Sequence, residues 1–79
     1  MEKENVILKL TEIFRKVFSD ESLTISDEMT ASDVDRWDSL SHMLMIAEVE
    51  SEFSIKFKLK ELNKMRNVGD MIEVIINKF

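Results

Sequence analysis

The sequence has 79 residues, of which 44% are hydrophobic and 34% are charged, and it carries a formal net charge of -5. This length and composition predict a single soluble globular domain over residues 1–79, with one modest core and no room for a large substrate pocket. Because the chain contains no cysteine and no long apolar run, the sequence argues against disulfides, thiolate metal sites and membrane insertion.

The acidic residues are concentrated in the middle of the chain. Residues 19–54 contain ten acids and a single Lys or Arg, Arg36, whereas residues 1–18 and 55–79 have net charges of +1 and +3. An acidic segment repels nucleic-acid phosphates and attracts basic protein surfaces, so we expect protein partners and no nucleic acid. A solvated acidic face that only aids solubility would explain the same pattern. The N-terminal segment lacks the features of a signal peptide, and we expect a monomer in the cytoplasm.

The first predicted element is a helix over about residues 3–18. Its apolar residues recur at helical spacing and define one face that should be buried: Val6, Ile7, Leu10, Ile13, Phe14, Val17 and Phe18. Residues 19–37 follow as a long connection rich in Ser, Thr and Asp, which favour turns and caps. A connection of this length in a compact domain is usually held by its own side chains. Four apolar residues could supply those contacts: Leu23, Ile25, Met29 and Val34.

A second helix is predicted from Ser39 to about Phe53. Asp38 is a suitable N-cap, because its carboxylate can accept hydrogen bonds from the amides of the first turn. The helix carries two apolar stripes. The first consists of Met45, Ile46, Val49 and Phe53, and the second of Leu40, Met43, Leu44 and Ala47. One stripe is sufficient for the core of a small domain, so the second is either further core or a surface that a partner covers.

Two shorter helices complete the predicted all-α fold. Residues 59–66 fit a helix whose inner side would carry Leu59, Leu62 and Met65. Asn67 is a candidate N-cap for the last helix. The apolar residues of this last helix again repeat at helical spacing: Val68, Met71, Ile72, Ile75, Ile76 and Phe79.

Residues 36–43, RWDSLSHM, contain the only tryptophan and the only histidine of the chain. Ser39 and His42 lie three positions apart on the predicted helix, so a hydrogen bond between them is conceivable. A serine hydrolase also needs a group that orients the histidine, an oxyanion hole and a closed pocket, and no GxSxG motif is present. Asp33 and Asp35 could begin a 12-residue calcium loop. That loop, however, needs glycine at its sixth position and glutamate at its twelfth, where this sequence has Asp38 and Leu44. We therefore expect no catalytic residue and no metal ligand.

A serine on the first turn of a helix, beside an acidic loop and an apolar helix face, suits the attachment of a group by another enzyme. The tripeptide Asp-Ser-Leu at residues 38–40, with Trp37 before it and Ser-His after it, resembles the attachment motif of acyl carrier proteins. The resemblance extends over essentially the whole chain. It implies a small four-helix bundle with a long loop between helices one and two. It also implies that Ser39 carries 4′-phosphopantetheine, installed from coenzyme A, whose terminal thiol bears an acyl or aminoacyl thioester.

The resemblance gives roles to further residues. Asp38 would cap the helix and present Ser39 to a phosphopantetheinyl transferase. The surface for partner enzymes, such as an acyl ligase or a synthase, would consist of Leu40, Met43, Leu44, Ala47 and Glu48. We expect Trp37 to pack against the end of the loop and His42 to lie on the surface near the attached arm. The protein would then be a cosubstrate of other enzymes and not an enzyme itself.

Departures from the pattern of fatty-acid-synthesis carriers bear on the pathway. Leu44 and Ser51 occupy positions where those carriers often have acids, and the third-helix region is basic. We therefore expect a stand-alone acyl carrier protein in a specialised fatty-acid, polyketide or related pathway. Two alternatives stay open: an aminoacyl or peptidyl carrier protein, and a carrier-like interaction module whose serine is never modified.

Overall fold

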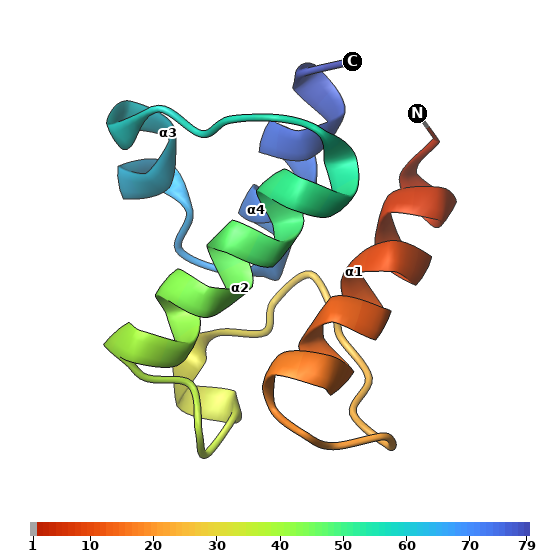
Figure 1. The fold of residues 1–79 in the computed structure, drawn as a ribbon, viewed down its shortest axis with the longest axis vertical. Coiled ribbons are helices and arrows are strands. Elements are labelled where there is room, and N and C mark those ends of the chain that lie inside the picture. The colour runs from red at the N-terminus through yellow and green to blue at the C-terminus, as the bar shows by residue number, and fades with distance from the viewer. Residues whose placement is uncertain (1) are drawn as a thin grey trace.

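The computed structural model describes residues 2–79, which form four α-helices joined by loops (Figure 1). The helices are α1 (Lys3–Val17), α2 (Ser39–Phe53), α3 (Leu59–Lys64) and α4 (Val68–Asn77), and the long connection after α1 contains a 3₁₀ turn, η1 (Ala31–Asp33). α1 packs against both α2 and α4. The described residues contain no strand, and the predicted all-α, four-helix class is confirmed. Within the same residues, no helix combines the length and the apolarity needed to cross a membrane.

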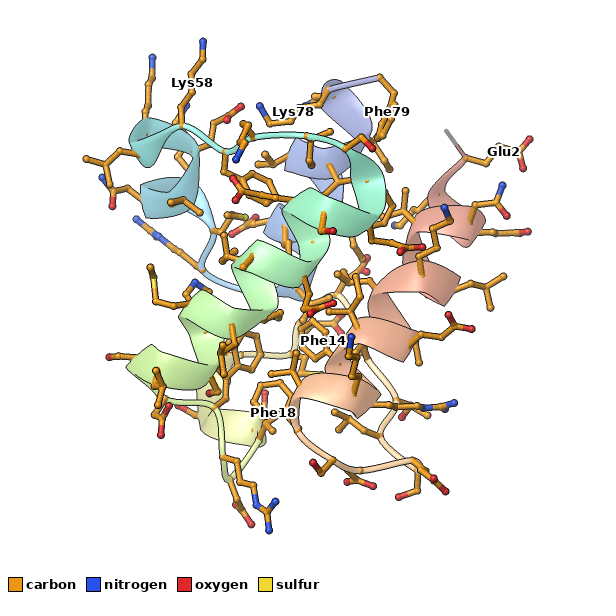
Figure 2. The ribbon with its side chains drawn as sticks, in the orientation of Figure 1. Glu2, Phe14, Phe18, Lys58, Lys78 and Phe79 are labelled. Carbon is orange, nitrogen blue, oxygen red and sulfur yellow. The ribbon has the colours of Figure 1, made fainter. Side chains whose placement is uncertain are left out.

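The three longer helices bury a common apolar core. Figure 2 shows Phe14 and Phe18 directed from the C-terminal end of α1 toward the middle of the molecule. The buried apolar residues are Val6, Leu10, Ile13, Phe14, Phe18, Met29, Met45, Ile46, Val49, Phe53, Val68, Met71, Ile72 and Ile75. All four members of the first α2 stripe belong to this set, which confirms that stripe as core.

The long connection between α1 and α2 is held by its own side chains, as predicted. Four apolar side chains pack in or against the core: Leu23, Ile25, Met29 and Val34. The backbone of the connection also bonds the start of α4, since the amides of Val68 and Gly69 donate to the carbonyls of Met29 and Asp27, each at 2.9 Å. A Cβ on Gly69 would lie 3.0 Å from the Asp27 carbonyl oxygen, so this close approach favours glycine.

α3 is shorter than predicted. It ends at Lys64 because Met65, which remains partly buried, leaves the helical conformation with φ −83° and ψ 92°. The chain then extends to Asn67, whose side-chain oxygen accepts a hydrogen bond from the Asp70 amide at 2.8 Å. The predicted N-cap of α4 is thereby confirmed, and the extended backbone that this cap needs limits the length of α3.

The prediction that Leu59 faces inward is wrong, because its side chain is 74% exposed. Ile55 and Phe57, from the extended segment before α3, pack against the core together with Leu62. These residues occupy the space that the first turn of α3 was expected to fill, so that turn faces solvent. Phe79 is also largely exposed, at 57%, and lies at the edge of the core instead of within it.

Candidate functional site

Asp38 and Ser41 close the N-terminus of α2 through reciprocal hydrogen bonds. The Asp38 carboxylate accepts from the Ser41 amide at 2.9 Å, and the Ser41 hydroxyl oxygen accepts from the Asp38 amide at 2.8 Å. The same hydroxyl donates to the Arg36 carbonyl oxygen at 2.7 Å. The backbone hydrogen bond from Ser41 is the main cause that lowers the pKa of Asp38, because it favours the charged carboxylate. Asp38 therefore caps the helix as predicted, and the hydroxyl of Ser41 is used in the cap.

Ser39 lies on the first turn of α2 and is exposed. Its hydroxyl takes part in none of the side-chain hydrogen bonds formed within residues 2–79, whereas Ser41 is half-buried and bonded on both sides. The free amides of the first turn give this end of the helix a partial positive charge, which favours a negatively charged substituent. Of the two serines in the motif, Ser39 is thus the one whose hydroxyl is available for chemistry.

Trp37 anchors the end of the long connection to the core. Its ring meets Phe14 edge-on at a centroid distance of 5.2 Å and lies 5.9 Å from Phe18. Edge-to-face and tilted pairs at these distances are favourable arrangements of aromatic rings. The predicted packing role of Trp37 is confirmed, and the position of the residue that precedes Asp38 is fixed by it.

His42 is half-buried and bonded to Trp37. The indole N–H of Trp37 donates to Nδ1 of His42 at 3.0 Å, and the two rings are stacked 6.0 Å apart. Because an indole nitrogen can only donate, Nδ1 must be the unprotonated nitrogen, and the neutral ring carries its hydrogen on Nε2. Neither nitrogen then has a free lone pair for the Ser39 hydroxyl. The geometry opposes the serine-hydrolase alternative, in which His42 would act as a general base.

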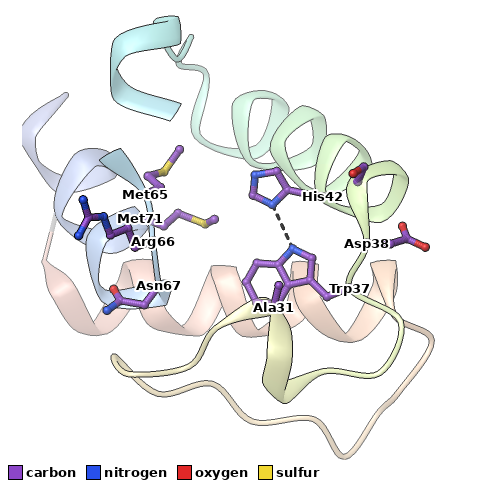
Figure 3. A pocket seen from close by; sticks show the side chains of 9 residues that line it. Ala31, Trp37, Asp38, His42, Met65, Arg66, Asn67 and Met71 are labelled. Atoms are coloured by element: carbon purple, nitrogen blue, oxygen red, sulfur yellow. Dashed lines mark hydrogen bonds between the residues drawn. The ribbon is translucent and has the colours of Figure 1, made fainter. Parts of the chain in front are cut away.

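A pocket of about 370 Å³ opens beside Ser39, between η1, the start of α2 and the connection from α3 to α4 (Figure 3). Its lining residues are Ala31, Trp37, Asp38, Ser39, His42, Met65, Arg66, Asn67 and Met71. Figure 3 shows Met65 and Met71 facing His42 across this space. The volume is at the small end of the range for ligand sites. No sequence pattern indicated the pocket, because its walls come from segments that are distant along the chain.

The second stripe of α2 lies on the surface next to Ser39. Leu40, Met43 and Leu44 are 72%, 67% and 55% exposed, and Ala47 is also exposed. Glu48 is half-exposed, and its carboxylate accepts a hydrogen bond from the Lys16 ammonium at 3.2 Å. The stripe is therefore not core, and its role in binding partners stays a prediction.

Among residues 2–79, no group of three or more His, Cys, Asp or Glu side chains is arranged to hold a metal ion.

The sequence and the fold are similar to those of a solved protein, a holo acyl carrier protein from Geobacter metallireducens whose structure was determined by NMR in solution. The match has a TM-score of 0.87 and 46% sequence identity, and it covers 92% of this chain and 84% of the other. The chain belongs to the acyl carrier protein family. Neither a protein-family model nor a curated protein matches the sequence.

Membership in the acyl carrier protein family confirms the coarser predictions. Acyl carrier proteins are carriers and not catalysts, and their holo form contains a phosphopantetheine prosthetic group, as the motif implied. The residues of this acyl carrier protein fit such a group, because Ser39 is exposed at the edge of a pocket and its hydroxyl has no hydrogen-bond partner among residues 2–79. Attachment at Ser39, presentation by Asp38 and the partner surface on α2 stay predictions.

The Trp37–His42 pair of this acyl carrier protein should respond to mild acid. Burial lowers the pKa of His42 from its ordinary value of 6.5, because it disfavours the charged ring. Between that lowered pKa and 6.5, the unfolded chain binds more protons than the folded one. The stability contributed by His42 is therefore complete above pH 6.5 and is lost as the pH falls through the lowered pKa. Protonation of Nδ1 also breaks the bond from Trp37.

We expect the fluorescence of Trp37, the only tryptophan, to change with a midpoint below pH 6.5. Burial is the cause of this low midpoint, and Asp38 and Arg66 are the charged residues that line the same pocket. The His42→Gln variant is the control, since it should lose the transition while the acid response of Asp38, at lower pH, remains. A midpoint at or above 6.5 would show that His42 is not held as the structure has it.

Proposed function

We propose that this chain carries acyl groups as thioesters on a phosphopantetheine arm attached to Ser39 and presents them to partner enzymes. The observation that carries the proposal is the position of Ser39 in a chain of the acyl carrier protein family: it is exposed, it directly follows the capping residue Asp38, and its hydroxyl forms no hydrogen bond within residues 2–79. Within the motif, the other serine has its hydroxyl occupied in the cap. The arm supplies a terminal thiol, a group that the cysteine-free chain does not contain.

The residues around Ser39 support its use as an attachment point. The hydrogen bond from the Ser41 amide to Asp38 keeps the first turn of α2 formed, and Trp37 fixes the chain just before it. A phosphodiester on Ser39 would sit at the positive end of α2, which stabilises it by about 0.3–1 kcal/mol. Attachment would thus require no unfolding of the helix, and the hydroxyl is accessible to a transferase without rearrangement.

The exposed stripe of α2 is proposed as the surface that meets the phosphopantetheinyl transferase and the acyl ligase or synthase. It joins the three exposed apolar residues Leu40, Met43 and Leu44 to Ala47 and Glu48, and it starts next to Ser39. An apolar patch with acidic neighbours complements a partner surface with an apolar centre and basic rim. We further propose that the protein acts in the cytoplasm. A specialised fatty-acid, polyketide or related pathway is proposed because Leu44 occupies a position on this face where fatty-acid-synthesis carriers often have an acid.

The proposal is tested by loading the protein in solution. Incubation with coenzyme A, magnesium and a broad-specificity phosphopantetheinyl transferase should add one phosphopantetheine, measured as the change in intact mass. A folded protein that several transferases fail to load would instead be an unmodified interaction module. Once the arm is in place, offering ligases with fatty-acid and amino-acid substrates distinguishes an acyl carrier from an aminoacyl or peptidyl carrier.

A further inference from the structure

The hydrogen bond from Trp37 leaves one nitrogen of His42 free, and that nitrogen faces the pocket beside Ser39. Trp37 Nε1 donates to Nδ1 at 3.0 Å, which puts the ring hydrogen on Nε2. Figure 3 shows the other edge of the ring turned toward Met65 and Met71, which line the pocket with it. Trp37 is itself packed against the core ring of Phe14, so it holds the His42 ring, and with it the Nε2–H donor, in place before any ligand arrives.

The pocket walls match the chemistry of a pantetheine chain. The ring of Trp37 and the side chains of Met65 and Met71 offer apolar contact, and the Nε2–H of His42 offers a hydrogen-bond donor. The side-chain oxygen of Asn67 accepts the capping hydrogen bond of α4, which leaves its amide NH2 as a second donor at the pocket. Figure 3 shows Arg66 on the far side of the pocket from His42. Pantetheine has a branched apolar segment with two methyl groups, followed by two amide carbonyls that accept hydrogen bonds. An arm that starts at Ser39 begins at the wall of this pocket.

We propose that His42 is a positioning residue that donates its Nε2 hydrogen to an amide carbonyl of the phosphopantetheine arm and so holds the arm in the pocket beside Ser39. Trp37 acts through His42, because it fixes the tautomer that can donate and the direction of the ring. This inference rests on the proposed attachment at Ser39. The exposed stripe of α2 then remains uncovered for partner enzymes, since Leu40, Met43 and Leu44 are not among the pocket-lining residues.

The first test uses the loaded protein, with attachment to Ser39 established by intact mass and fragmentation. Conversion from the apo to the holo form should shift the Nε2 resonance of His42 and produce NMR contacts between the ring and the arm. The alkylation rate of the arm thiol by iodoacetamide reports how often the arm leaves the pocket. His42→Phe keeps a ring but removes the donor, and it should raise this rate about 3- to 10-fold, the range expected for one hydrogen bond.

Two further variants separate positioning from a general effect on the fold. His42→Gln restores an N–H donor and should give a rate closer to that of the original protein, whereas Leu8→Ala, on the exposed surface of α1 away from the pocket, should leave the rate unchanged. Equal rates in the original protein and His42→Phe, with no ring-to-arm contacts in the holo form, would overturn the inference while leaving the attachment at Ser39 intact. Absence of loading would overturn the proposed function and this inference with it.

Discussion

Ser39→Ala is expected to abolish the gain of phosphopantetheine completely, whereas Ser41→Ala is expected to retain it. The two serines are two positions apart in one motif, but they differ in exposure and in hydrogen bonding. Ser39 is exposed and unbonded within the described residues, and Ser41 is bonded to Asp38 and Arg36. Intact mass after incubation with coenzyme A and a transferase measures the difference, which is all or none.

For stability the order of the two variants should be reversed: Ser41→Ala, which still loads, should be destabilised, and Ser39→Ala should not. Ser39→Ala removes no hydrogen bond within residues 2–79, so its free energy of unfolding should stay near that of the original protein. Ser41→Ala removes the acceptor for the Asp38 amide and the donor to Arg36, and should cost about 0.5–1.5 kcal/mol. Urea unfolding measures both. A modified Ser41, or a Ser39→Ala variant that loses as much stability as Ser41→Ala, would contradict the roles assigned here.

The helices were predictable because the signals for them are local. Apolar residues at helical spacing gave α1, α2 and α4, and the capping residues Asp38 and Asn67 gave the starts of α2 and α4. Capping depends on a side chain and the amides two or three positions after it, so the sequence alone contains the necessary information. The apolar residues that hold the long connection were found in the same way, since a connection of that length needs such contacts.

The errors concern elements whose positions depend on packing between distant segments. Periodicity placed Leu59 inside, but it could not show that Ile55 and Phe57 would take the space against the core. The pair of Trp37 and His42 was also missed as a contact. Its two members lie on either side of the helix start, where neither the spacing of a helix nor that of a strand applies.

Ser41 illustrates a signal that the sequence did contain. In the sequence, the resemblance to the attachment motif assigns the arm to Ser39 and gives Ser41 no role. A reciprocal cap normally pairs a Ser or Thr with a Glu or Gln three residues later. Here the order of side-chain types is changed, with Asp38 first and Ser41 third in the helix, but the same two bonds form. Recognition of that variant would have shown which hydroxyl is occupied.

The second large effect is expected from truncations on the two faces of α2. Ile46→Ala and Phe53→Ala remove side chains that are 7% and 4% exposed, and each should lower the free energy of unfolding by about 2–5 kcal/mol. That is a large fraction of the 5–15 kcal/mol typical of a small domain. Met43→Ala and Leu44→Ala remove side chains that are more than half exposed, and each should cost less than about 1 kcal/mol.

The four variants differ in a second measurement, because the proposed partner surface is on the exposed face alone. Met43→Ala and Leu44→Ala should slow loading by the transferase or transfer by a ligase while the protein stays folded. Ile46→Ala should affect these rates only under conditions where part of the protein is unfolded, since its side chain is inside the core. Urea unfolding and loading rates at a temperature well below the midpoint separate the two cases. If Met43→Ala proves as destabilising as Ile46→Ala, or if neither exposed variant changes any loading rate, this face of α2 is not a binding surface.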